Sequence, residues 1–186
     1  MTAAGLAPLD PDTAQRTFRA VLDALARPGT VHRLPAGPGV PAALLPTLAL
    51  ADLDTPVAVL TENPDPADAV ATATTAPVTD LPAARLVAAL RPLAAGELGT
   101  ARTGSAAAPE DAALVTLAVP ALDGGAPLRI SGPGIAGTRT LAPVGVPADL
   151  AAARAGAAFP AGADLLLVTP DGQLLGLPRS TRIEED

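Results

Sequence analysis

The chain has 186 residues, a net charge of −7, 49% hydrophobic residues and only two aromatic residues, both phenylalanine. Nucleic-acid binders normally carry a basic face and often aromatic stacking platforms, so an acidic chain of this composition predicts no nucleic-acid partner. The sequence contains neither a signal-peptide pattern nor about 18 uncharged apolar residues in a row, and we expect a cytoplasmic protein without a membrane partner.

Helical signals dominate the first half of the chain. Asp12 is a plausible N-cap with Gln15 in capping-box position, and apolar residues at helical spacing predict a helix over 13–27. Pro28-Gly29 ends this helix. The other elements expected in this half are short strands at 30–34 and 57–60 and helices at 46–52 and 66–74.

Strand signals dominate the second half. Residues 83–90 fit either a helix or a buried strand, and residues 96–109 predict a loop rich in glycine, serine and alanine. Pro170-Asp171-Gly172 separates two apolar runs and predicts an antiparallel hairpin. The expected strands are 114–119, 128–131, 164–169 and 173–177, with a short helix within 147–157.

Uninterrupted apolar runs such as residues 165–168 are typical of strands that are covered on both faces. Helices from the first half would supply that cover. We therefore predict an α/β fold, a single domain over residues 1–186 with three layers and a mixed β-sheet.

The side chains that the sequence lacks restrict its chemistry. All 12 basic residues are arginine, which excludes a pyridoxal phosphate Schiff base and a Walker A lysine. The chain has no cysteine, and His32 is its only histidine, so iron–sulfur clusters and multi-histidine metal centres are excluded. We expect no cofactor, no metal site and no catalytic residue. Asp52 and Asp54 form the nearest carboxylate pair, and turn formation explains them as well as acid–base chemistry does.

Two arginine-containing segments are candidate contact sites. Arg27 lies at the predicted end of the first helix and, with His32, would suit an anion, although an arginine there also complements the helix dipole. Arg179 and Arg182 follow the last predicted strand. We favour a protein interface for this pair, with phosphate or carboxylate binding and a solvated tail as the alternatives.

Gly132 to Gly137 fits the pattern G-x-G-x-x-G and follows a predicted strand. In a dinucleotide fold such a turn opens a helix and cradles a pyrophosphate, but here the strand-like residues 138–141 follow. We favour a structural turn in which Gly132 and Gly134 supply special backbone conformations. A nucleotide-binding enzyme that uses this turn is the alternative function, and a small hydrolase or isomerase built on His32 and carboxylates is a third.

Six segments keep a common order along nearly the whole chain. They are Phe18-Arg19 through Arg27-Pro28-Gly29, Leu50-Ala51-Asp52 with Asp54-Thr55-Pro56-Val57, Gly99-Thr100 leading to Ala108-Pro109-Glu110, Leu128 through Ile135, Phe159-Pro160 with Gly162 and Asp164, and Leu177 through Thr181. This ordered set resembles the PhnH family, the H subunit of the bacterial carbon–phosphorus lyase system. Residues 83–105 depart from the pattern, because they are shortened and alanine-rich.

The resemblance implies a fold similar to the large domain of pyridoxal-phosphate-dependent transferases, without the cofactor. It also implies a homodimer that joins the G, I and J subunits in a core complex. With the G, I and L proteins, the H subunit would support a transfer in which a phosphonate displaces adenine from ATP, giving ribose 1-phosphonate 5-triphosphate. The resemblance assigns no catalytic residue. The predicted ligand or interface contacts, taken from the local sequence alone, are Arg27, His32, Gly132, Gly134 and Arg179.

Overall fold

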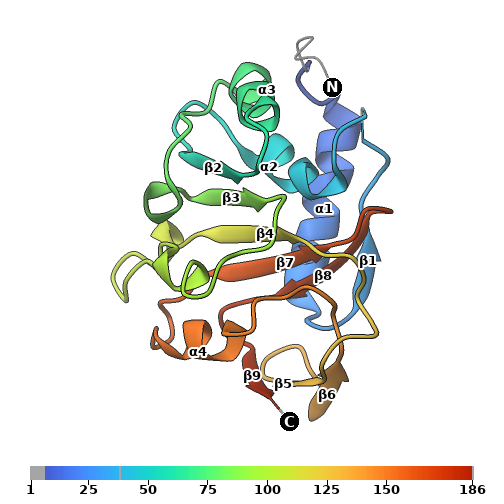
Figure 1. The fold of residues 1–186 in the computed structure, drawn as a ribbon, viewed down its shortest axis with the longest axis vertical. Helices are drawn as coiled ribbons and strands as arrows, with labels where there is room; N and C mark the ends of the chain where they lie inside the picture. Colours follow the sequence, from blue (N-terminus) through green and yellow to red (C-terminus); the bar gives the residue numbers. More distant parts are fainter. Residues whose placement is uncertain (1–6, 38, 186) are drawn as a thin grey trace.

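A six-stranded mixed β-sheet forms the centre of the molecule in a computed structural model that describes residues 7–37 and 39–185 (Figure 1). Its strand order is β1-β8-β7-β4-β3-β2, in which β2, β3, β4 and β7 are parallel and β8 and β1 are antiparallel to their neighbours. The strands are β1 (Val31–Arg33), β2 (Val57–Leu60), β3 (Leu86–Ala89), β4 (Leu114–Ala118), β7 (Asp164–Val168) and β8 (Gln173–Leu177). The predicted α/β class, the mixed sheet and the β7–β8 hairpin are therefore confirmed.

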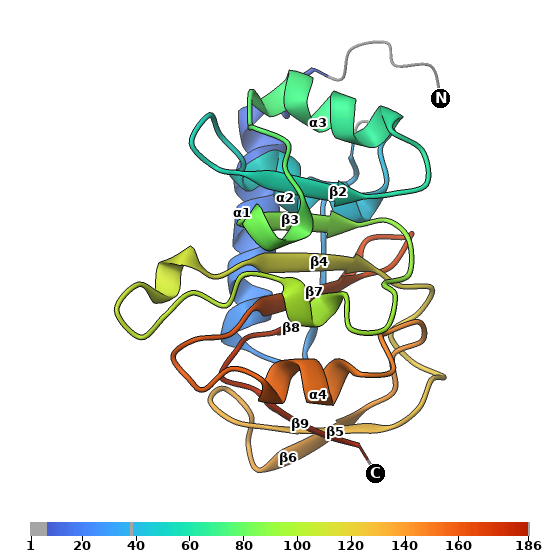
Figure 2. The same ribbon diagram turned by 60° about the vertical axis from the view of Figure 1, so that its left-hand side comes forward.

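Helices from the first half of the chain cover one face of this sheet (Figures 1 and 2). They are α1 (Pro11–Ala26), α2 (Leu45–Leu50), which follows a 3-10 turn at Ala42–Leu44, and α3 (Asp65–Thr74). Leu166 and Leu174 of the sheet share a buried cluster with Val21 of α1, and Ala88 of β3 shares one with Val70 of α3. This layer matches the predicted cover.

The opposite face is covered by other parts of the chain. A second, antiparallel sheet of order β6-β5-β9 lies there, together with helix α4 (Leu150–Ala155) (Figure 2). Its strands are β5 (Leu128–Ser131), β6 (Thr138–Leu141) and β9 (Arg182–Glu185). Short 3-10 turns also occur at Leu81–Ala83, Leu98–Thr100 and Pro109–Asp111. The expectation that first-half helices cover both faces is wrong, since Ile130 and Leu150 pack on this face instead.

Helix α1 begins two residues earlier than its sequence signals indicate. Asp10, and not Asp12, is the N-cap, and its carboxylate accepts a hydrogen bond from the Thr13 amide at 3.0 Å. Hydrogen bonding with Thr13 lowers the pKa of Asp10. Pro11 occupies the first turn, where its missing N–H costs nothing, and this explains the earlier start.

The ambiguous residues 83–90 contain a strand. All four residues of β3 are buried, because this strand lies between β2 and β4 and both of its faces are covered. Central position in a parallel sheet therefore decides against the helix that the alanine-rich composition also allowed.

Among the described residues, no helix is both long and apolar enough to cross a membrane.

Helix α1 lies against the backbone of β8 at Gly176. A Cβ atom added there would lie 2.4 Å from the Ala24 carbonyl oxygen, which is backbone and cannot rotate away. We expect Gly176→Ala to lower the free energy of unfolding by about 2–3 kcal/mol, because the helix must shift. Urea denaturation measures this loss. Gly99→Ala is the control, since nothing lies within 4 Å of the added atom, and equal stability of the two variants would contradict this packing.

Candidate functional site, an arginine-lined cavity beside helix α4

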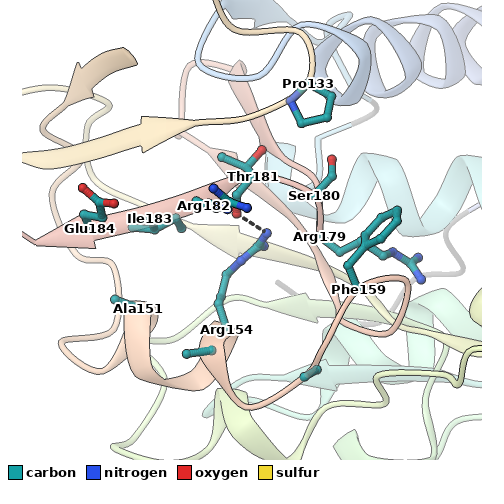
Figure 3. Close-up of a pocket in the computed structure, with 12 residues that line it drawn as sticks. Pro133, Ala151, Arg154, Phe159, Arg179, Ser180, Thr181, Arg182, Ile183 and Glu184 are labelled. Carbon is teal, nitrogen blue, oxygen red and sulfur yellow. Dashed lines mark hydrogen bonds between the residues drawn. The ribbon is translucent and has the colours of Figure 1, made fainter. Parts of the chain in front are cut away.

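A cavity of about 640 Å³ lies between α4, β9 and the loop that carries Pro133 (Figure 3). The sheet places it, because β8 ends at Leu177 and the chain then turns through residues 178–181 into β9. The side chains with polar groups in its wall are Arg154, Arg179, Ser180, Thr181, Arg182 and Glu184. Phe159 supplies the one aromatic ring among the lining residues.

Arg154 extends from α4 toward the segment that follows β8 (Figure 3). Its Nη1 donates to the carbonyls of Ala163, at 3.2 Å, and Leu177, at 2.9 Å, and its Nη2 donates to those of Pro178 and Thr181. Burial lowers the pKa of Arg154 to about 10, so the guanidinium stays charged at neutral pH. Within the described residues it forms no salt bridge, and carbonyl dipoles alone contact its charge.

Arg179 is held by the first residue of β7. Its Nη2 donates to Oδ2 of Asp164 at 2.6 Å, its Nε lies 3.2 Å from both carboxylate oxygens, and its backbone N–H donates to Oδ1 at 2.7 Å. Nη1 donates to the Pro109 carbonyl at 2.6 Å. Both side chains are 18% exposed. Arg179 therefore fixes the start of β7 to the segment after β8.

Three side chains of the cavity wall are open to contact with a ligand. They are a guanidinium and a hydroxyl without hydrogen-bond partners within the described residues, and an exposed aromatic ring. The Arg182 guanidinium is exposed and, within the described residues, makes no hydrogen bond or ion pair. Thr181 is 4% exposed and its hydroxyl has no hydrogen-bond partner. Phe159 is 70% exposed, which is unusual for a large apolar ring. The cavity thus combines a cationic side with an apolar side.

The two predicted glycine positions are packed against neighbouring backbone. Gly132 has φ 137° and Gly134 has φ 81°, and both values disfavour any other residue. An added Cβ would lie 2.8 Å from the Ser180 carbonyl at the first position and 2.8 Å from the Ala26 carbonyl at the second. Strand β6 follows this turn, and no helix opens there. The turn joins the end of α1 to the cavity wall, where Pro133 contributes.

Neither Arg27 nor His32 lines the cavity beside α4. Arg27 caps the C-terminus of α1 and its Nη1 pairs with Asp23 at 2.9 Å on the surface. His32 lies in β1 beside α1, in a shallow groove that Arg16 and Arg19 also line, and its Nε2 is buried without a partner. The structure therefore brings the Arg179 segment and the glycine turn together and leaves His32 on the α1 side of the sheet.

Asp52 and Asp54 belong to a turn. An oxygen of the Asp52 carboxylate accepts hydrogen bonds from the Thr55 hydroxyl and, at 3.1 Å, from the Asp54 amide. This hydrogen bonding, chiefly with Thr55, lowers the pKa of Asp52. These contacts agree with the prediction that Asp52 and Asp54 form a turn. Across the described residues, no three acidic or histidine side chains gather in a way that would hold a metal ion.

One carboxylate, just before the 3-10 turn at Leu98–Thr100, has a strongly lowered pKa. Glu97 accepts two hydrogen bonds from Arg91, at 2.7 and 2.9 Å, and one from the Ala94 amide at 2.8 Å. Hydrogen bonding from Arg91 lowers the pKa of Glu97 from 4.5 to about 2. The stability that the ionised Glu97 contributes is therefore complete above pH 4.5 and is lost as the pH falls toward about 2.

We expect Glu97→Gln to lower the free energy of unfolding by about 1 kcal/mol at neutral pH, after allowance for solvent screening. The difference from the parent should shrink below pH 4.5 and disappear near pH 2. Urea denaturation at a series of pH values measures it. A difference that stays constant over this range would contradict the assignment to the charge of Glu97.

The sequence patterns mark neither Arg154 nor the exposed Phe159 of the cavity wall as a contact residue. Arg154 is the one charged residue within the apolar helix α4, whose sequence is LAAARA. This pattern fits an exposed arginine as well as one that is hydrogen-bonded to the chain, because a long arginine side chain can reach either position. Phe159 has no signal in the sequence either.

The fold and the cavity define a mixed α/β protein with an arginine-lined cavity and without a lysine, a cysteine or a second histidine. The model of the family described as bacterial phosphonate metabolism protein (PhnH) matches residues 9–184, and the chain belongs to this family. The protein named alpha-D-ribose 1-methylphosphonate 5-triphosphate synthase subunit PhnH, from Rhizobium meliloti (strain 1021), is 35% identical over 185 residues, covering 93% of this chain and 91% of that protein. The resemblance to the PhnH family is therefore confirmed.

Proposed function

We propose that this chain is the H subunit of a carbon–phosphorus lyase core complex and acts in the breakdown of organic phosphonates. Membership of the PhnH family carries the proposal. The printed name of the relative from Rhizobium meliloti, a synthase subunit, supports a role in transferring the ribose triphosphate of ATP to a phosphonate. On this proposal the G, I and L subunits act with this chain in that step.

The proposed role within the complex is structural. The chain has no lysine and no cysteine and has one histidine, whose Nε2 is buried without a partner away from the cavity. Most guanidinium donors near the cavity are used inside the chain, by Arg154 and Arg179. Few groups remain that would move a proton or form a covalent intermediate. The catalytic groups would then come from partner subunits.

The proposal also includes the domain structure of the chain, its oligomeric state and its location. The chain would form one PhnH-like domain over residues 1–186, similar to the large domain of pyridoxal-phosphate-dependent transferases but without that cofactor. It would act in the cytoplasm as a homodimer, bound to the G, I and J subunits, and without contact to nucleic acid or membrane. Exposed arginines on β9 and at the end of α1 suit such a protein interface.

Co-expression with tagged partners tests the proposal. The untagged chain should be retained with tagged G, I and J subunits in a complex of fixed stoichiometry through size-exclusion chromatography. A control with tagged J subunit alone separates assembly from nonspecific retention. If the folded chain elutes alone while G, I and J assemble without it, the proposed role is wrong.

A further inference from the structure

The charged side chains that line the cavity beside α4 do not neutralise one another. Asp164 is fully engaged by Arg179, so this pair is neutral. Arg154 and Arg182 remain, and Glu184 is the one carboxylate that faces them from the lining. The lining therefore carries a net charge of about +1 in a chain whose overall charge is −7. Arg154 is partly withdrawn from solvent and carbonyl dipoles alone contact its charge, so an anionic ligand would supply the missing counter-charge.

Hydrogen-bond donors accompany this charge. The Arg182 guanidinium offers a free fork, and the Ser180 hydroxyl makes no hydrogen bond within the described residues. The Thr181 hydroxyl has no partner either, and rotation about its Cα–Cβ bond is the movement that would turn it toward the cavity. Three donor groups on consecutive residues suit an oxyanion with three or four oxygens better than a carboxylate with two.

The other side of the cavity is apolar. The ring of Phe159 stands exposed at the edge, and Ala155, Ala157 and Ile183 continue the apolar surface. A volume of about 640 Å³ lies in the ordinary range for small-molecule sites. An anion without an attached group would leave this apolar half empty.

We propose that this cavity binds an organic phosphate, whose tetrahedral oxyanion contacts Arg182, Ser180 and Thr181 and whose apolar or flat part lies on Phe159. Arg154 acts through its charge and through the carbonyls that it holds, because its terminal nitrogens already donate to them. Glu184 opposes the anion and limits its affinity. This proposal concerns the chain alone and does not depend on its assembly into a complex.

Titration of the purified full-length chain with three probes tests the proposal. Phenyl phosphate has both parts of the ligand, inorganic phosphate lacks the ring, and benzoate lacks the tetrahedral group. Phenyl phosphate should bind with 1:1 stoichiometry, about tenfold more tightly than inorganic phosphate, since tenfold corresponds to about 1.4 kcal/mol and a ring contact is of this order. Benzoate should bind more weakly than phenyl phosphate. Equal affinities for all three probes, or no binding at millimolar concentrations, would overturn the proposal.

Single substitutions test the cationic side and the apolar side of the cavity separately. Arg182→Gln should weaken phenyl phosphate binding at least tenfold, because a charge-assisted hydrogen bond is lost. Phe159→Ala should abolish the preference for phenyl phosphate over inorganic phosphate without changing the affinity for the latter. Glu184→Gln should tighten binding severalfold. Arg33→Gln, at the far end of the β7–β8 hairpin, is the charge-matched control and should change nothing. Binding that survives Arg182→Gln and Phe159→Ala unchanged would place the ligand elsewhere.

The threonine hydroxyl gives a test that separates binding from folding. Thr181→Val removes a hydroxyl that has no partner, so the variant should be at least as stable as the parent toward urea. It should nevertheless bind phenyl phosphate several-fold more weakly. Thr17→Val is the matched control, because the hydroxyl of Thr17 in α1 is also buried without a partner and lies away from the cavity. Its affinity for phenyl phosphate should equal that of the parent, and an equal loss in both variants would contradict the proposal.

Discussion

Asp164→Asn is expected to lower the free energy of unfolding by about 2–4 kcal/mol, because it removes one partner of a partly buried ion pair. The variant keeps the shape of the side chain and removes its charge. It leaves Arg179 without a counter-charge and also removes the negative charge that favours ionised Arg154. Urea denaturation at neutral pH, followed by circular dichroism, measures the loss.

A double-mutant cycle attributes this loss to the pair. Arg179→Met alone should also destabilise, because the carboxylate of Asp164 then loses the three hydrogen bonds that the guanidinium donates. The backbone N–H of residue 179 also donates to this carboxylate and survives the change, so that part of the interaction remains. The double variant should lose less than the sum of the single variants, by about 1–3 kcal/mol. Asp12→Asn, in an exposed pair, is the control and should cause no measurable change. Strict additivity would contradict the coupling.

Arg154→Met is expected to lower the free energy of unfolding by about 3–4 kcal/mol, because buried carbonyl oxygens lose their donors. The four carbonyls belong to three different parts of the chain, just before β7, at the end of β8 and in the turn before β9. One guanidinium therefore joins the main sheet to the turn that leads into the second sheet. Hydrogen exchange should show the largest loss of protection in residues 178–185.

The series of substitutions at Arg154 separates hydrogen bonding from hydrophobic packing. Arg154→Lys keeps the charge but offers fewer donors in a different geometry, so its stability should lie between that of the parent and that of Arg154→Met. Arg16→Met on the surface of α1 controls for the general effect of the change. If Arg154→Met unfolds at the same urea concentration as the parent, then water satisfies these carbonyls and Arg154 does not hold the cavity wall.

Local sequence signals are sufficient to predict most of the main sheet. The apolar runs at residues 57–60, 114–119 and 164–169 coincide with β2, β4 and β7 within one residue, and the turn at Pro170-Asp171-Gly172 correctly predicts the hairpin with β8. These elements are predictable because the sheet is buried on both faces and demands continuous apolar residues.

The second sheet is not predictable in the same way. Strand β9 carries Arg182 and Glu184, with Ile183 as its partly buried residue, and four residues at the end of a chain are too few for a periodic pattern. Its partner β5 is separated from it by about 50 residues, and local sequence does not encode such a pairing. The cover of the second face therefore depends on long-range contacts.

The candidate site was predictable only in part. The glycine pattern and Arg179 each have a local signal, and the structure brings the two segments together through the contact of Gly132 with the Ser180 carbonyl. The ion pair of Arg179 has no local sequence signal, since its partner Asp164 is 15 residues away, at the start of the other strand of the hairpin. His32 lies in β1, within the predicted strand 30–34. The sequence does not indicate, however, that the sheet separates His32 from Arg179.

The most direct test of the proposed function is the release of adenine from ATP in the presence of methylphosphonate. The purified chain alone should show no release above the background, because the proposal assigns the catalytic groups to the partner subunits. The G, I and L proteins should release adenine at full rate when this chain is added and at a much lower rate without it. Methylphosphonate-dependent release by the chain alone, or full release by the other subunits without it, would contradict the account.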